Sequence, residues 1–309
     1  MVKLKKILSF IIVIAVIFAF TLNYERISDE IVEYINRKPE VIIKPGNGFK
    51  KNYEFKYIRM SNDYIPYNKQ DLLEIFYAVL NNGWEEFTFY CPTEYTDCLN
   101  DLGSLSKDEI LLSNLNSFVS SYNSYENLRT VFDTAGEVKV YVKYKYSKED
   151  IARIDADINH IIENDLKDTM SDKEKIKYLH DYIVDRTKYD SEKADYDKSP
   201  YDSDRIHGVL YDGYAICSGY TDTMEVFLTK LGIPNYKIAS DNHVWNAVYL
   251  NDAWYHLDVT WDDPVTNTGE DIVLYDYYLV DNNKIAQDDD PVKHEHLFDM
   301  NVFLEFGTQ

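Results

Sequence analysis

Residues 212–234, DGYAICSGYTDTMEVFLTKLGIP, have the pattern of one helix with a cysteine at its start. Their apolar side chains recur at three- and four-residue spacing, and Gly232 followed by Pro234 ends the pattern. Cys217 is therefore expected near the first turn, where the positive end of the helix dipole favours a thiolate over a thiol. Gly219 lets another backbone or a substrate approach closely. The predicted helix face consists of Cys217, Tyr220, Met224, Phe227, Leu228 and Leu231.

Two short runs of apolar and aromatic residues follow, at 243–250 and 253–261, with only Asn and Asp at 251–252 between them. Such a pair is suited to a two-residue β-hairpin turn. With that turn, His243 and Asp258 become diagonal neighbours on one face of the hairpin, within reach of a hydrogen bond. A three-residue turn would instead place the two side chains on opposite faces.

The predicted helix and hairpin together supply a thiol, an imidazole and a carboxylate. In an activated nucleophile the base takes the thiol proton, and the carboxylate fixes the tautomer of the base. We therefore interpret Cys217, His243 and Asp258 as a catalytic triad, although a single cysteine near a helix start is usually just packed. A zinc site made of these three residues would lack a fourth ligand. His294 and His296 are expected on the surface or in a loop, so no metal and no cofactor are predicted.

Three blocks of sequence resemble the transglutaminase-like superfamily, and more narrowly the exported bacterial transglutaminase-domain proteins. They are residues 213–220 (GYAICSGY), 243–246 (HVWN) and 254–264 (WYHLDVTWDDP). The resemblance extends over about residues 147–298. It implies an α+β, papain-like fold in which the helix bearing Cys217 packs on an antiparallel sheet that carries the other two triad residues. It also implies thioacyl-enzyme chemistry on amides of proteins or peptides.

One departure from the family concerns the oxyanion hole. Well-studied transglutaminases use a tryptophan upstream of the cysteine as a donor, whereas this chain has no Trp between Trp84 and Trp245. The backbone N–H of Cys217 remains as one donor. The second donor is open, and the candidate hydroxyls are those of Tyr189, Tyr211 and Tyr214.

The predicted activity is transfer of an acyl group from an amide to Cys217, and then to an amine or to water. The sequence does not choose between cross-linking and hydrolysis by a peptidase or amidase, because access and solvent exclusion select the acceptor. The alternative is a catalytically inactive domain that serves as an extracytoplasmic binding or scaffolding module, since a fold alone does not establish a function.

Residues 51–146 predict a smaller α+β domain of unknown role before the transglutaminase-like domain at 147–309. Helical and alternating patterns both occur in it, and none of its residues has the spacing of a catalytic or metal site. The predicted helix starts are Asn68, Ser106-x-x-Glu109, Ser147-x-x-Asp150 and Ser171-x-x-Glu174; strands are expected around Phe87 to Cys91 and Val138 to Tyr146, the latter after a turn at Ala135-Gly136.

The first 25 residues have the layout of an export signal, because Lys3, Lys5 and Lys6 precede an apolar run at 7–22. This run of 16 residues is shorter than the roughly 20 that cross a bilayer, and no clear cleavage site follows it. We expect a signal anchor or a signal peptide at 1–25 and a linker or stalk at 26–50. The remainder is then extracytoplasmic, held at the cell membrane by the N-terminal segment or secreted.

Charge and cysteine content restrict the partners and the compartment. The chain has 32 basic and 54 acidic residues, a net charge of −22, which repels phosphate and argues against nucleic-acid binding. Hydrophobic residues at 45% exclude wholesale disorder. In an oxidising compartment Cys91 and Cys98 are close enough to form a disulfide, which leaves Cys217 as the single thiol.

Overall fold

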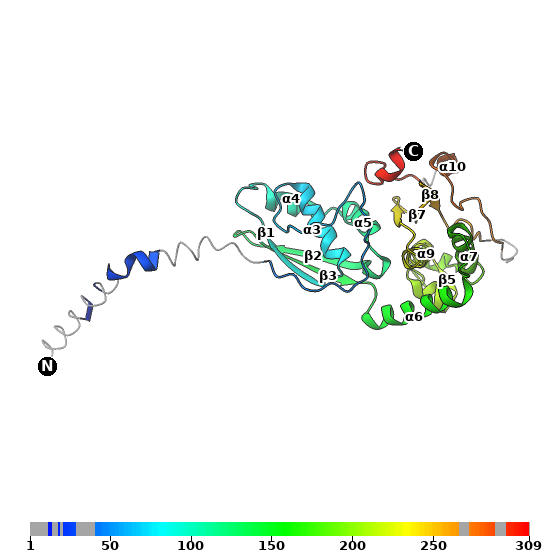
Figure 1. The fold of residues 1–309 in the computed structure, drawn as a ribbon, viewed down its shortest axis with the longest axis horizontal. Helices are drawn as coiled ribbons and strands as arrows, with labels where there is room; N and C mark the ends of the chain where they lie inside the picture. Colours follow the sequence, from blue (N-terminus) through cyan, green and yellow to red (C-terminus); the bar gives the residue numbers. More distant parts are fainter. Residues whose placement is uncertain are drawn as a thin grey trace. The chain divides into compact units, whose positions relative to one another are not determined.

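The computed structural model divides the chain into two compact units, Met1–Val41 and Ile42–Gln309. Both predicted folded domains, 51–146 and 147–309, fall within the second unit (Figure 1). The predicted N-terminal anchor lies mostly outside the described residues, and no described helix is long and apolar enough to cross a membrane. The described residues are 12–13, 18, 21–28, 41–265, 272–287 and 295–308.

The first part of the second unit is a three-stranded antiparallel sheet in the order β1-β3-β2, with helices beside it (Figure 1). The predicted hairpin is confirmed, because β2 and β3 pair around a turn in which Gly136 has φ +91°. Phe87 and Phe89 of β1 alternate into the core. The elements are α3 (Lys69–Asn81), β1 (Glu86–Tyr90), α4 (Cys98–Leu105), α5 (Glu109–Ser117), the 3-10 turn η1 (Ser121–Asn123), β2 (Tyr125–Phe132) and β3 (Glu137–Tyr144).

Local capping explains where these helices begin. Asn68 caps α3 as predicted, accepting a hydrogen bond from the backbone N–H of Asp71. The predicted start at Ser106 is wrong, because Ser106 is in the helical conformation and ends α4, whereas an N-cap needs an extended backbone. Asp108 caps α5 instead, accepting from the N–H of Leu111 at 3.0 Å.

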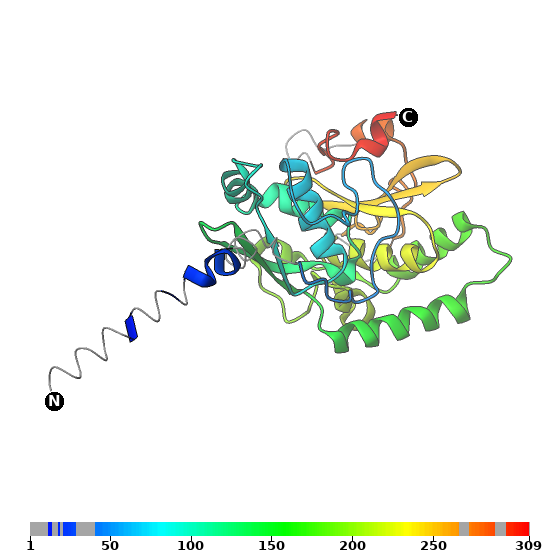
Figure 2. The same cartoon turned by 60° about the vertical axis from the view of Figure 1, so that its left-hand side comes forward.

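In the second part of this unit, residues 147–309, α9 lies at the centre of the predicted core. This helix contacts β6 and β7 as well as α6 and α7, and the sheet β6-β7-β8 is antiparallel throughout. Capping boxes begin α6 at Ser147 and α7 at Ser171, as predicted, and Figure 2 shows α6 as the long green helix along the lower edge. The fold is therefore the expected α+β arrangement, with a cysteine-bearing helix packed on an antiparallel sheet. Its elements are α6 (Lys148–Asp165), α7 (Asp172–Val184), β4 (Lys188–Tyr189), α8 (Ser191–Tyr196), the π-helical turn η2 (Gly208–Asp212), β5 (Tyr214–Ala215), α9 (Cys217–Lys230), β6 (Asn235–Ala239), β7 (Val244–Leu250), β8 (Ala253–Leu257), α10 (Asn282–Gln287) and the 3-10 turn η3 (Leu304–Thr308).

The hairpin β7–β8 has the predicted register. Leu250 pairs with Ala253, and the ladder continues to the pair Asn246 and Leu257. The two turn residues, Asn251 and Asp252, have φ of +50° and +64°, the left-handed conformation that a type I′ turn requires at both positions.

Cys91 and Cys98 form a disulfide with a Cα–Cα distance of 5.8 Å, which confirms the predicted pairing. The bond links the end of β1 to the first residue of α4. Cys217 is left as the free cysteine of the chain.

Candidate active site

Cys217 is the first residue of α9. Ile216 before it is extended and offers no side-chain cap, and the first turn contains no acidic residue. The partial positive charge of the helix N-terminus therefore acts on the thiol without a nearby carboxylate on the same turn to oppose it. The side chain is only partly buried, as a nucleophile that meets a substrate must be.

The start of α9 is fixed by the chain segment at 203–205. The backbone N–H of Ile216 donates to the carbonyl oxygen of Ser203 at 2.9 Å. A Cβ on Gly219 would lie 2.5 Å from that same oxygen, so only glycine permits this approach. The close approach expected at Gly219 is thus an approach of backbone to backbone, two residues after Cys217 and within the first turn of α9.

His243 and Asp258 meet at the open end of the β7–β8 hairpin. The ladder itself stops at Asn246 and Leu257, and the two side chains meet just beyond it, with Nε2 of His243 2.6 Å from Oδ2 of Asp258. This hydrogen bond places the proton on Nε2 and leaves Nδ1 of His243 as the nitrogen that can accept a proton from Cys217.

The charges in this group stabilise each other. Burial alone lowers the pKa of His243, but the charge and hydrogen bond of Asp258, together with the interaction with Cys217, outweigh burial and raise that pKa to about 10. Burial alone raises the pKa of Asp258, and the charges and hydrogen bonds of His243 and His296 reverse this effect and hold it well below its usual range. The favoured state is therefore an imidazolium beside a carboxylate.

His296 lies in the same cluster; it is in a turn, as the expectation of a loop position allowed, but it is not on the surface. Its side chain is buried, and its Nε2 is 2.9 Å from Oδ2 of Asp258, the oxygen that His243 also contacts. The sequence signal was the pair His294-x-His296, and only the fold shows that its second member returns to the hairpin. His294 lies outside the described residues.

His243, Asp258 and His296 form the group that could hold a metal ion among the described residues. Their Nε2 to Oδ2 distances of 2.6 and 2.9 Å are hydrogen-bond lengths. Two ligands of one tetrahedral zinc ion, each about 2.0–2.1 Å from the metal, lie about 3.3 Å apart. The geometry therefore fits two imidazole donors on one carboxylate oxygen better than a zinc site.

A cavity of about 290 Å³ contains both Cys217 and His243 on its wall. Among its described lining residues only Ala239 and Val244 are aliphatic, so the space suits a polar group. The region before residue 147 supplies part of the wall, mainly from α5. The polar lining from α5 and from the connection between β6 and β7 consists of Ser113, Asn116, Ser117, Ser240, Asp241 and Asn242.

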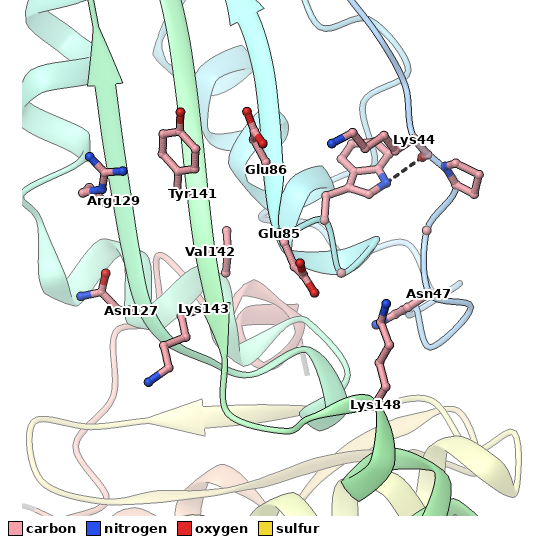
Figure 3. A pocket seen from close by; sticks show the side chains of 14 residues that line it. Lys44, Asn47, Glu85, Glu86, Asn127, Arg129, Tyr141, Val142, Lys143 and Lys148 are labelled. Carbon is pink, nitrogen blue, oxygen red and sulfur yellow. Dashed lines mark hydrogen bonds between the residues drawn. The ribbon is translucent and has the colours of Figure 1, made fainter.

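Two larger hollows, of about 670 and 830 Å³, have none of Cys217, His243 and Asp258 in their walls. Figure 3 shows the first one beside β1 and β3, where Glu85, Arg129 and Lys148 bring charges of both signs to its wall. Trp84 donates its indole N–H to the carbonyl oxygen of Lys44 there, at 2.8 Å. Cys217 lines neither hollow, so size alone does not identify the candidate active site.

The three candidate oxyanion tyrosines differ in their surroundings. Tyr211 donates its hydroxyl to Asp157 at 2.8 Å, and Tyr214 stacks on Tyr201 with ring centroids 4.4 Å apart. Tyr189 pairs in register with Ala215, two residues before Cys217. Burial and the charge of Cys217 raise the pKa of Tyr189 to about 12, so its hydroxyl keeps its proton at neutral pH.

A family model matches the part of the chain that carries this site. Residues 160–259 match the model of the Transglutaminase-like superfamily, and no curated protein sequence matches the chain. One similar solved structure is described as "Crystal structure of a TGase" (20% identity, 44% of each chain covered, TM-score 0.34). Another is described as "The Crystal Structure of a Putative Cysteine Protease from Cytophaga hutchinsonii" (12% identity, 43% of this chain and 61% of that chain covered, TM-score 0.27).

The matched part spans less than two thirds of either solved structure, at 44% and 61% of their chains. The family match is more specific, because Cys217, His243 and Asp258 all lie inside it. Residues 160–259 are therefore the part of this chain that matches the Transglutaminase-like superfamily.

Proposed function

We propose that this protein is a thiol acyl-transfer enzyme that acts on amides through Cys217. The observation that supports the proposal is that Cys217, at a helix N-terminus, and His243 line one polar cavity. Behind this wall, Nε2 of His243 lies 2.6 Å from Oδ2 of the buried Asp258. A thiol, a base and a carboxylate that orients the base are the parts an activated cysteine needs.

In the first half-reaction, Nδ1 of His243 holds the proton of Cys217, and the thiolate attacks the amide carbonyl carbon. A carbon–sulfur bond forms, and the carbonyl electrons move onto the oxygen, where the backbone N–H of Cys217 donates to them. The carbon–nitrogen bond then breaks, and His243 gives its proton to the departing amine or ammonia. A thioester on Cys217 remains.

In the second half-reaction, an amine or a water molecule attacks the thioester carbonyl carbon. His243 removes a proton from the attacking group and returns it to the sulfur as the carbon–sulfur bond breaks. Transfer to an amine cross-links two molecules, whereas transfer to water is hydrolysis. Both outcomes use the same residues, and the choice depends on how well the closed site excludes water.

We further propose that the substrates are protein or peptide amides outside the cytoplasm. The Cys91–Cys98 disulfide supports an oxidising compartment, and the basic and apolar segment at 1–25 supports export with contact to the membrane. The polar cavity supports a hydrophilic acyl group, such as a carboxamide side chain. A net charge of −22 disfavours nucleic acids and favours neutral or basic partners.

The test is ammonia release from a carboxamide peptide by the purified full-length chain, with and without a fluorescent primary amine. Cys217→Ala is expected to abolish release, and His243→Ala to lower it almost as far, on the order of a million-fold. Asp258→Ala is expected to cost about ten-thousand-fold, because the nucleophile and base survive with poorer orientation. Melting curves check that each variant is folded.

The pH profile gives a second measurement on the same enzyme. Because the pKa of His243 is raised from 6.5 to about 10, the imidazolium persists through neutral pH and is lost only as the pH rises through about 10. On the alkaline side, the rate should therefore fall only as the pH approaches that range. A Cys217→Ala variant that still releases ammonia would refute the assignment. A wild-type chain that is inert, with a thiol that alkylates no faster than a free cysteine, would favour the binding or scaffolding module.

A further inference from the structure

The carboxylate of Asp258 is held by four hydrogen-bond donors. The backbone N–H groups of Thr260 and Trp261 donate to Oδ1 at 3.0 and 3.2 Å. The Nε2 atoms of His243 and His296 both contact Oδ2, at 2.6 and 2.9 Å. Asp258 is buried, so these protein groups replace water as the solvent of its charge.

His296 is itself fixed by aromatic rings. Its ring centroid lies 5.2 Å from Trp245, 4.9 Å from Trp261 and 5.1 Å from Tyr277, and the Tyr277 ring is stacked on it. The side chain is fully buried, with 0% exposed. A ring packed in this way cannot turn away from Asp258 without displacing its neighbours.

This histidine lies outside the part of the chain that the family match covers, which ends at residue 259. It comes from the C-terminal segment at 295–308, which returns to the open end of the β7–β8 hairpin. The contact therefore joins a residue outside the matched region to Asp258 inside it.

We propose that His296 is a positioning residue, which holds the carboxylate of Asp258 toward His243 so that the C-terminal segment completes the acyl-transfer site. The proposal rests on the proposed function of Cys217. Without the His296 donor, Oδ2 would have only His243 as a partner, and the carboxylate would be held less firmly about its terminal torsion, by the two backbone N–H groups on Oδ1 and by His243. The orientation of His243 would then be less well defined.

The charge balance gives this role a measurable pH signature. His296 is one of the groups that stabilise the ionised form of Asp258, and its removal favours the neutral carboxylic acid. A carboxylate that is less well aligned with Nε2 of His243 stabilises the imidazolium less, and with it the thiolate of Cys217. The thiolate should therefore be lost at a higher pH on the acid side.

Other titratable groups also face this cluster, and each stays in place in the variants of His296. Their charges act on Asp258, on His296 or on their immediate partners. They are Cys217 and His243 in the site itself, Tyr189 from β4, His256 from β8, and Asp262, which bonds to His180 of α7.

The experiment measures the rate at which iodoacetamide alkylates Cys217 as a function of pH, in the full-length chain. His296→Leu removes the donor and keeps an apolar side chain in the aromatic surroundings. The acid midpoint is expected to rise by about one pH unit, which slows alkylation about tenfold below the midpoint. His296→Gln restores an N–H donor at similar reach and should recover most of the rate. His296→Asn, with a shorter side chain, should not.

His256→Leu is the matched control. His256 is equally buried, and it accepts from the Trp245 indole N–H at 2.9 Å and contacts Asn282 at 2.7 Å, rather than contacting Asp258. This variant is expected to lower the melting temperature and leave the acid midpoint where it is. If His296→Leu, like His256→Leu, lowered the melting temperature and left the acid midpoint of alkylation unchanged, His296 would be a packing residue. That result would overturn the proposal.

Added zinc tests whether His243, Asp258 and His296 form a metal site instead of a hydrogen-bonded cluster. If added zinc protected wild-type Cys217 from alkylation, and His296→Leu removed that protection, the cluster would be a metal site and the positioning role would be overturned. Failure of the proposed function looks different, because the wild-type thiol itself would then show no rapid alkylation near neutral pH.

Discussion

At the scale of single residues, the hydroxyl of Tyr189 replaces the missing tryptophan as the expected second oxyanion donor. Its backbone pairs with Ala215, beside the start of α9, and its raised pKa of about 12 keeps it a donor at neutral pH. Tyr189→Phe should therefore lower the rate of acyl transfer by about a hundredfold and leave the alkylation rate of Cys217 nearly unchanged, because the donor acts only on the developing oxyanion.

Tyr211→Phe is the matched control for this prediction, since the Tyr211 hydroxyl is directed to Asp157 at 2.8 Å. It should not affect turnover. Equal losses in the two variants, or a loss in Tyr211→Phe alone, would contradict the assignment of Tyr189. Both measurements use ammonia release from the same carboxamide peptide.

Individual residues were predictable where a local signal existed. The position of Cys217 at a helix start follows from apolar spacing and from the Gly232 stop, which act over one helix. His296 was not predictable, because its contact with Asp258 spans 38 residues and depends on where the C-terminal segment returns. A histidine in a short H-x-H pair gives no information on burial.

At the scale of elements, the beginning of α9 depends on a close backbone contact at Gly219. A Cβ there would meet the carbonyl oxygen of Ser203 at 2.5 Å and that of Arg205 at 3.0 Å. Gly219→Ala should therefore destabilise the fold by about 1–3 kcal/mol, the usual cost of overpacking. It should also lower activity, because the helix start that holds Cys217 must move.

Gly103 in α4 provides the control, since a Cβ there would make only an ordinary contact of 3.7 Å with Phe132. Gly103→Ala should stabilise the protein by about 0.5–1 kcal/mol through helix propensity. Chemical denaturation measures both changes. A Gly219→Ala variant as stable as Gly103→Ala would show that the segment at 203–205 does not fix α9.

Element prediction succeeded where turn and cap signals were unambiguous and failed where two signals competed. Asn251 and Asp252 fixed the hairpin register, because both residues tolerate positive φ. Ser106 and Asp108 are both good capping residues two positions apart, and α4, which was not predicted, extends to Leu105 and leaves only Asp108 in an extended conformation. Competition of this kind is settled by packing, which local sequence does not report.

At the scale of the whole molecule, a buried polar network joins the region at 51–146 to α9. Lys51 lies 2.5 Å from Glu225, and the other oxygen of Glu225 accepts from the backbone N–H of Ser121 at 2.7 Å. Lys237 bonds to Asp222 and to Ser124, each at 2.9 Å. The sequence predicted two domains from a change in pattern near residue 147, but the pairing of buried charges across that boundary has no local signature.

These buried pairs predict that the two regions unfold together. Lys51→Met would leave the buried carboxylate of Glu225 without its ion-pair partner. Removing one partner of a buried ion pair typically lowers the free energy of unfolding by about 3–5 kcal/mol. Calorimetry of the full-length chain should show one transition for residues 42–309 that moves as a whole to lower temperature. Lys139→Met is the control, because Lys139 pairs with Glu137 on the surface at 2.8 Å and should cost no more than about 1 kcal/mol. Two separate transitions, only one of which moved in Lys51→Met, would instead show independent domains at 51–146 and 147–309.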